Sequence, residues 1–315
     1  AYTDVTSTFA YSSRLHNWVC PKIDDTGVFE IKDGRHPVVE LHLPTGEFIP
    51  NDSELCYDSG DNPSFNLITG PNMAGKSTYL RQNALIALLA QSGCYVPASG
   101  AHIGIIDRIF CRVGASDNLA RGESTFLVEM TETANILLSA TKRSLVIMDE
   151  VGRGTSTEDG LSIARAVSEY LLDSVKCRTF FATHYHELTR MEHSRVRMLC
   201  MDVKENAGSV VFLRKIKEGA SENSYGIHVA RLAGIPDSVI NRAKEVLSHI
   251  QAINSDKPVV PPVEKTESEK SFDVQKDDIS KNKEFYTPGL FCDEEIILDE
   301  ILSCDVDNIT PISAL

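Results

Sequence analysis

The chain has 315 residues, 42% of them hydrophobic and 24% charged, and a net charge of −14 at pH 7. This composition is typical of a globular protein with one large core or two domains, and the sequence contains no apolar run long enough to span a membrane and no secretory signal. Residues 252–315 hold 15 Asp and Glu against 6 Lys, so −9 of the net charge lies there. The remainder lacks the strongly basic surface of a nucleic-acid-binding domain, so we expect any large DNA-contacting surface to lie outside this chain.

The first residues contain no start methionine, so we expect a piece of a longer protein. Eight cysteines are scattered along the chain, and none forms a C-x-x-C pair. This usage predicts reduced thiols in a cytoplasmic protein rather than disulfides or a zinc site.

Residues 1–62 are predicted to be a connecting segment followed by a β-rich region. Short apolar runs at 28–31 and 38–43 flank a cluster of turn-forming residues at 33–37. This arrangement predicts two strands joined by a turn, ahead of the main domain.

Residues 63–220 alternate between strand and helix patterns. The predicted helices cover 76–91, 124–139 and 158–172, and the predicted strands cover 65–69, 102–113, 144–148, 178–182, 196–201 and 209–213. Alternating strands and helices predict an α/β domain whose mostly parallel sheet is flanked by helices.

Residues 221–251 are predicted to form two helices, 224–233 and 236–250, broken by a Gly-Ile-Pro turn. This spacing is that of a helix-turn-helix element. Residues 252–287 are rich in Pro, Ser, Lys and acidic side chains, which predicts a flexible linker. Residues 292–303 are acidic and apolar at helical spacing, which predicts a short helix within a C-terminal interaction or oligomerisation segment at 288–315.

A complete phosphate-binding loop separates the first strand and helix of the α/β domain. Gly70 and Gly75 allow the backbone to turn so that successive N–H groups face one anion, and the helix N-terminus adds the positive end of its dipole. Lys76 is expected to reach the β- and γ-phosphates and Ser77 to bind Mg²⁺. The pattern predicts a nucleoside triphosphate site made of Gly70, Pro71, Asn72, Met73, Ala74, Gly75, Lys76, Ser77 and Thr78.

A second pattern complements this loop. The apolar strand at 144–148 ends in two adjacent carboxylates, Asp149 and Glu150. Beside a phosphate-binding loop, Asp149 is expected near Mg²⁺, and Glu150 is expected to orient and deprotonate an attacking water. A surface turn after a core strand is the alternative interpretation of the same residues.

Adjacent carboxylates after an apolar strand resemble the ABC class of P-loop ATPases, in which hydrolysis needs two subunits. A transporter of that class would carry an L-S-G-G-Q signature, which this chain lacks. Instead, Ser124 opens the predicted helix at 124–139 as its N-cap, with a free hydroxyl. We expect it to contact the γ-phosphate of nucleotide held by a partner subunit, although a plain N-cap is the alternative.

Four motifs occur in order: 69–78, 124–130, 149–157 and 181–185. Together they resemble the ATPase domain of the MutS family of DNA mismatch-recognition proteins. The tetrapeptide at 34–37 and the tripeptide at 224–226 resemble the same family. The likeness covers roughly residues 17–251.

The resemblance implies an ABC-type ATPase that binds ATP and Mg²⁺ and dimerises through composite sites. It implies that Glu150 is the catalytic carboxylate, that Ser124 acts in trans, and that Ser77 and Asp149 serve the metal. It also implies that Asn72 senses the γ-phosphate and that His184 is a switch beside the attacking water. Phe48 resembles the aromatic residue that stacks on adenine, although a core phenylalanine is an equal alternative.

The resemblance also implies partners. The helix pair at 221–251 would dock on a second copy of the domain, although its spacing also allows DNA binding. Mismatched double-stranded DNA would be bound by domains missing from this chain, and a MutL-type repair protein would act with it. Gly289-Leu290-Phe291 faintly resembles the peptide that docks on the replication sliding clamp, but the expected glutamine is absent. The family implies a cytoplasmic, nucleoid-associated protein and no membrane.

Two residues depart from the family pattern. Ala74 stands where Gly or Ser is usual, so the loop backbone there is either ordinary or strained. Glu158 stands where Tyr is frequent, close to the expected dimer interface. Two alternative functions remain: a MutS paralogue acting in recombination, which would carry a nuclease-like extension, and a transport ATPase, which would carry the missing signature.

Overall fold

The computed structural model describes residues 2–58, 62–113, 125–206, 209–221 and 225–255. All of them belong to one compact unit, Ala1–Lys257. Residues from 256 onward lie outside the described residues. They include most of the expected linker at 252–287, the whole C-terminal segment at 288–315 and the clamp-like tripeptide at 289–291.

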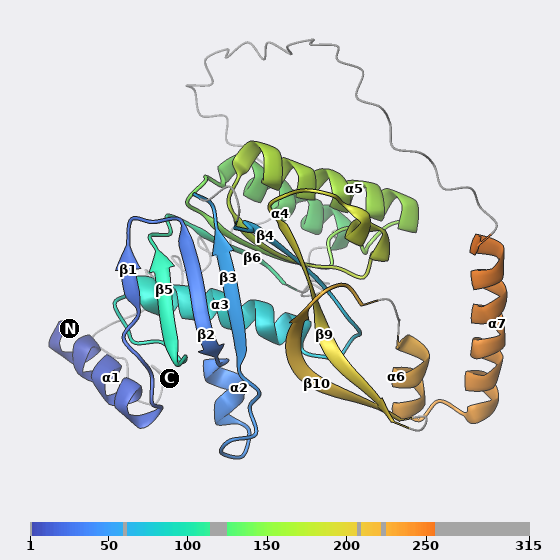
Figure 1. The fold of residues 1–315 in the computed structure, drawn as a ribbon, viewed down its shortest axis with the longest axis horizontal. Coiled ribbons are helices and arrows are strands. Elements are labelled where there is room, and N and C mark those ends of the chain that lie inside the picture. Colours follow the sequence, from blue (N-terminus) through green and yellow to red (C-terminus); the bar gives the residue numbers. More distant parts are fainter. Residues whose placement is uncertain (1, 59–61, 114–124, 207–208, 222–224, 256–315) are drawn as a thin grey trace, which may run out of the picture. The chain divides into compact units, whose positions relative to one another are not determined.

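A six-stranded sheet lies at the centre of this unit (Figure 1). Its strand order is β10-β9-β4-β8-β7-β6, and every neighbouring pair is parallel except β10 with β9. The mostly parallel sheet expected from the sequence is therefore confirmed. The strands are β4 (Phe65–Thr69), β6 (Ile109–Arg112), β7 (Leu145–Asp149), β8 (Arg178–Ala182), β9 (Val196–Asn206) and β10 (Ser209–Glu218).

A second, four-stranded sheet has the order β1-β5-β2-β3. The prediction of one strand over 102–113 is wrong, because this segment contributes β5 to the second sheet and β6 to the first. Between them, Asp107 accepts hydrogen bonds from Thr141 Oγ1 at 2.5 Å and from Ser144 Oγ at 2.8 Å, which fix the chain where it crosses. The strands are β1 (Lys22–Asp24), β2 (Val28–Gly34), β3 (Asn51–Cys56) and β5 (Gly100–Gly104).

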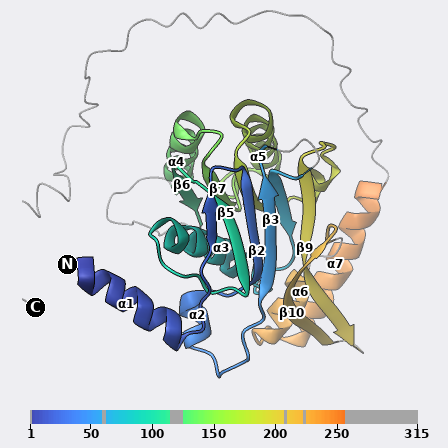
Figure 2. The same ribbon diagram turned by 60° about the vertical axis from the view of Figure 1, so that its left-hand side comes forward.

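Helices cover both faces of the six-stranded sheet (Figures 1 and 2). Helix α3 lies between the two sheets, and one apolar core joins Tyr79 on α3 to Phe29 on β2 and Phe180 on β8. A second core joins α4 and α5 to the opposite face, through Ile136 and Val167. The helices are α3 (Lys76–Gln91), α4 (Thr125–Ser139) and α5 (Thr157–Tyr170), which continues as a π-helical turn, Leu171–Val175.

The segment 38–43 is helix α2 (Pro37–Leu41) followed by a turn, so the strand predicted there is wrong. Pro37 occupies the first helical turn, where its fixed φ and missing N–H are harmless. The preceding His36 accepts hydrogen bonds at Nδ1 from the backbone N–H groups of Val38 and Val39, at 3.3 and 3.2 Å. This cap outweighs the β-propensity of the two valines.

Helices also form near both ends of the described chain. Helix α1 (Tyr2–Leu15) lies in the predicted connecting segment, for which the sequence analysis predicted no helix. The predicted helix pair is confirmed as α6 (Gly226–Leu232) and α7 (Asp237–Ser255). Gly234 separates them with a φ of 88°, a conformation that favours glycine.

Arg178, at the start of β8, is completely buried. Its guanidinium group donates to four backbone carbonyls, those of Val28 at 3.3 Å, Gly104 and Ile105 at 3.1 Å, and Arg143 at 2.6 Å. Burial lowers the pKa of Arg178, because the charged form loses its hydration. The carbonyls of Val28 and Gly104 belong to the four-stranded sheet, so this side chain links the two sheets.

No helix among the described residues is long and apolar enough to cross a membrane. The cysteines in the same part of the chain are all free thiols, which is consistent with the reduced state expected from their spacing. They are Cys20, Cys56, Cys94, Cys111, Cys177 and Cys200.

Replacing Arg178 with methionine should lower the free energy of unfolding by at least about 3 kcal/mol, because buried carbonyls would lose their donor. Chemical denaturation followed by fluorescence would measure this. Arg165→Met is the matched control, since Arg165 makes only an exposed ion pair with Glu169, and it should change stability by less than about 0.5 kcal/mol. Equal effects of the two substitutions would contradict the role given to Arg178.

Candidate functional site

The site forms where three neighbouring strands end. Strands β4, β8 and β7 are adjacent and parallel, and Ile68, Ala182 and Asp149 lie at matching positions at their carboxyl ends. The carboxyl edge of a parallel sheet is where α/β proteins bind ligands. The loop at 70–75, the two carboxylates and His184 therefore meet at one edge, although they lie far apart in the sequence.

The phosphate-binding loop has the backbone that its glycines allow. Gly70 and Gly75 have φ values of 136° and 106°, in the region that favours glycine. Ala74 has ordinary backbone and is completely buried, so of the two alternatives for this position the unstrained one holds. Instead Met73 adopts a φ of 65°, and its side chain is 75% exposed. The departure at Ala74 thus leaves the loop intact.

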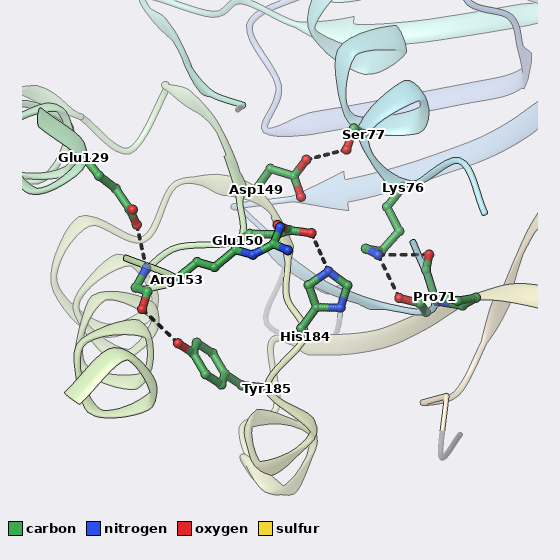
Figure 3. A network of polar contacts seen from close by, with 11 residues as sticks. Pro71, Lys76, Ser77, Glu129, Asp149, Glu150, Arg153, His184 and Tyr185 are labelled. Atoms are coloured by element: carbon green, nitrogen blue, oxygen red, sulfur yellow. Dashed lines mark hydrogen bonds and ion pairs between the residues drawn. The ribbon is translucent and has the colours of Figure 1, made fainter. Parts of the chain in front are cut away.

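Lys76 begins α3 and is almost completely buried. Its Nζ donates to the carbonyls of Gly70 at 2.7 Å and Pro71 at 3.1 Å, within its own loop (Figure 3). Burial lowers the pKa of Lys76, while the negative charges of Glu150 and Asp149 oppose that shift. The loop thus presents a positive charge held by two neutral acceptors, ready to exchange them for an anion.

Ser77 and Asp149 come together as predicted. Ser77 Oγ donates to Asp149 Oδ2 at 2.5 Å. The other oxygen, Oδ1, is buried and has no hydrogen-bond partner among the residues that the structure describes. Burial raises the pKa of Asp149, and the nearby charge of Glu150 adds to the shift. A hydroxyl beside an unsatisfied buried carboxylate oxygen is a donor set that suits Mg²⁺, so the residues fit this ion.

Glu150 follows in an unusual conformation. Its φ is 58°, and its backbone N–H donates to the Ala182 carbonyl at 2.9 Å. Its carboxylate contacts His184 Nε2 through Oε1 and Arg153 through Oε2 (Figure 3). The hydrogen bond from His184 is the main cause that lowers the pKa of Glu150 to about 2, and Arg153 adds to it. Glu150 is therefore ionised at neutral pH, as a general base must be.

Two further side chains hold the turn after Glu150, and the sequence analysis gave them no role. Glu129 Oε1 on α4 accepts from the Gly152 backbone N–H at 2.5 Å. The Tyr185 hydroxyl donates to the Gly152 carbonyl at 2.9 Å. Glu129 lies in the motif at 124–130 and is a carboxylate within the apolar start of a helix, and these two sequence signals could have pointed to it.

Three pockets surround the loop. A pocket of about 520 Å³ contains Asn72, Ser77, Asp149 and Glu150. Another of about 230 Å³ lies between the loop and α6, and Asn72 and His184 line it. Asn72 thus borders both pockets, and its role beside the γ-phosphate stays a prediction.

Phe48 lines the third pocket, of about 260 Å³, together with Met73 and Thr78 of the loop. This placement fits a base-stacking role better than the core alternative, since Phe48 is only half-buried. Arg214 lines the same pocket with a φ of 54°, and the sequence analysis gave it no role. Ser124 lies outside the described residues, so its placement stays a prediction.

Comparison with known proteins identifies the family of this chain and several relatives. Residues 66–251 match the family described as MutS domain V. Over its whole length the chain is 54% identical to the DNA mismatch repair protein MutS of Treponema denticola, 53% to that of Treponema pallidum and 50% to that of Rhodopirellula baltica. It spans 36%, 35% and 34% of these relatives, about a third of their length.

The ionised state of Glu150 should make stability depend on pH. Because its pKa in the folded chain is about 2, against an ordinary value of 4.5, its stabilising contribution is present above pH 4.5 and is lost as the pH falls from there toward 2. Between pH 5.5 and 3.5 the unsubstituted chain should lose about 1 kcal/mol more free energy of unfolding than Glu150→Gln. Denaturant titrations at the two pH values would measure this. Glu192→Gln, at an exposed position, should behave like the unsubstituted chain; if Glu150→Gln does so too, the ion pairing of Glu150 is wrong.

Proposed function

The chain belongs to the MutS family of DNA mismatch repair proteins, and from this premise we propose that it is the C-terminal ATPase and dimerisation part of a bacterial mismatch-recognition protein. The observation that carries the proposal is the convergence of Lys76, the Ser77–Asp149 pair and the Glu150–His184 pair at one sheet edge. In this proposal ATP binding closes a dimer of these domains, and hydrolysis resets it.

The chemistry follows from the side chains present. Lys76 exchanges its loop carbonyls for the β- and γ-phosphates, while the loop N–H groups hold the same anion. Ser77 and Asp149 would hold Mg²⁺, which neutralises charge developing on the phosphates. Glu150 accepts a proton from the attacking water, and Asn72 and His184 orient that water. Phe48 stacks on adenine at the far end of the loop.

We place this site in the ABC class of P-loop ATPases, with composite sites. Thr125 and Gly154 line the 520 Å³ pocket together with Asn72 and Ser77 of the same chain, so the start of α4 borders the nucleotide site of its own subunit, and the composite arrangement rests on the family membership. In a dimer, Ser124 would reach the nucleotide of the other subunit. Glu158, exposed in the first turn of α5, would lie near that interface.

We assign dimerisation to the helix pair rather than DNA binding. An open apolar groove of about 680 Å³ runs along α6 and α7. Val239 and Val246 in this groove are 54% and 40% exposed, so the groove has apolar surface to bury. A second copy of the chain is the occupant that the family membership favours.

The remaining partners are proposals that follow from the family. Mismatched double-stranded DNA would be bound by parts of the protein outside this chain, in the cytoplasm near the nucleoid, and a MutL-type protein would read the ATP state. Docking of residues 289–291 on the sliding clamp is the least supported of these, because its glutamine is missing.

ATP hydrolysis measured against protein concentration tests the composite site. Specific activity should rise with concentration, and Glu150→Gln should lower kcat by at least about 100-fold while ATP still binds. Mixing Glu150→Gln with Ser124→Ala should restore part of the activity, because one of the two mixed sites is then intact. Activity independent of concentration would show a self-contained site and remove the role of Ser124 in trans.

Dimerisation can be tested separately by sedimentation equilibrium with ATP present. Val246→Asp should weaken the dimer by at least about tenfold, because a carboxylate cannot be buried unpaired in an apolar contact. Ser248→Asp adds the same charge two residues along α7, outside the groove, and should leave the dimer constant within about twofold. If neither variant changes the constant, the helix pair is not the dimer contact.

A further inference from the structure

Two side chains, Glu129 and Tyr185, hold the backbone of Gly152, and Figure 3 shows both of them pointing toward the chain after Glu150. The Gly152 N–H donates to Glu129 Oε1 at 2.5 Å, and the Gly152 carbonyl accepts from the Tyr185 hydroxyl at 2.9 Å. Glu129 belongs to α4, and Tyr185 follows His184 after β8. Two separate elements thus grip the turn that carries Glu150.

The turn at Gly152 also packs tightly against the start of helix α5. Gly152 has a φ of 87°, and a Cβ added to it would lie 2.5 Å from the carbonyl oxygen of Gly160. A Cβ on Gly160 would in turn lie 2.2 Å from the Tyr185 hydroxyl. The start of α5 therefore backs the turn directly, and the two hydrogen bonds on Gly152 determine how the turn sits against it.

Of the two side chains that hold Gly152, Glu129 is the one carried by helix α4. Its side chain is buried, and a buried carboxylate without a donor is costly, so the bond to Gly152 holds it firmly. Three residues earlier, Phe126 packs on Gly154, where an added Cβ would lie 2.9 Å from the Phe126 Cβ. The first two turns of α4 are thus attached to the catalytic turn at Gly152 and at Gly154.

We propose that Glu129 is a positioning residue that makes the direction of the Glu150 carboxylate depend on the position of α4. A shift of the N-terminal end of α4 moves the Glu129 carboxylate, pulls on the Gly152 N–H and turns Glu150, two residues earlier in the chain. The inference rests on the proposed ATPase function. Through Glu129, contacts that the start of α4 makes with a partner subunit in the proposed dimer would control the catalytic competence of its own subunit.

Steady-state hydrolysis and binding of a fluorescent ATP analogue by the 315-residue chain test this. Glu129→Ala should lower kcat by at least about tenfold and leave the analogue Kd within about twofold, because Glu150 does not hold the nucleotide in the ground state. Glu129→Gln keeps an oxygen acceptor for Gly152 and should recover most of the lost kcat. Thr131→Ala, which removes only a hydrogen bond within α4, is the matched control and should leave kcat unchanged.

A second measurement does not need turnover. The ring nitrogen signals of His184 in NMR spectra report its contact with Glu150, so Glu129→Ala should move them in the direction that Glu150→Gln does. Glu129→Gln should leave them close to those of the unsubstituted chain. Tyr185→Phe, which removes the opposing donor without emptying buried space, should also lower kcat alone.

The outcomes separate the two proposals. Unchanged kcat and unchanged His184 signals in Glu129→Ala would overturn the positioning role and leave the ATPase proposal standing. Equal losses in Glu129→Ala and Glu129→Gln, or a parallel loss of ATP affinity, would show a general structural role instead. An unsubstituted chain that binds no ATP would overturn the ATPase function and with it this inference.

Discussion

The position of β8 between β4 and β7 is the constraint on which the site depends. Residues that carry the chemistry come from three strands that are distant in sequence, and only this order brings their carboxyl ends together. The register is equally strict, since Ala182 lies opposite both Ile68 and Asp149 and accepts the N–H of Glu150. A shift of one residue in β8 would carry His184 away from Glu150 and turn the buried side chains of the strand to the other face.

Without nucleotide, the charged groups of the site satisfy one another only in part. Lys76 rests on neutral carbonyls, Glu150 holds two cationic or polar partners, and Asp149 keeps one buried oxygen unpaired. Burial disfavours the charged forms of both Lys76 and Asp149, so each gains from a ligand of opposite charge. A triphosphate with bound Mg²⁺ would supply the negative charge for Lys76 and the positive charge for Asp149 at once. The metal ion and the triphosphate would therefore bind together.

Much of the fold and the site was predictable, because local patterns determine them. The strand–loop–helix around Lys76 and the strand before Asp149 have sharp sequence signals, and their structures agree with the predictions. Helix α2 was missed because a proline and a histidine cap outweigh the propensity of two valines. The segment 102–113 was predicted as one strand, whereas it forms two strands in different sheets. The break could not be predicted, because Asp107 between them contacts residues more than thirty positions away. Glu129 and Tyr185 lie within two of the motifs, but their roles were missed because each side chain acts on the backbone of Gly152, a contact that a sequence motif does not reveal.

The buried guanidinium of Arg178 has a consequence for how the chain folds. Arg178 belongs to the six-stranded sheet, whereas its acceptors come from the four-stranded sheet, from Ile105 just after β5 and from Arg143 before β7, so these hydrogen bonds form only when all of these parts are in place. An intermediate with one sheet formed would have to keep this arginine hydrated and leave the core around β8 open to water. We therefore expect the two sheets to fold and unfold together, so that the four-stranded sheet does not unfold alone while the nucleotide site stays intact.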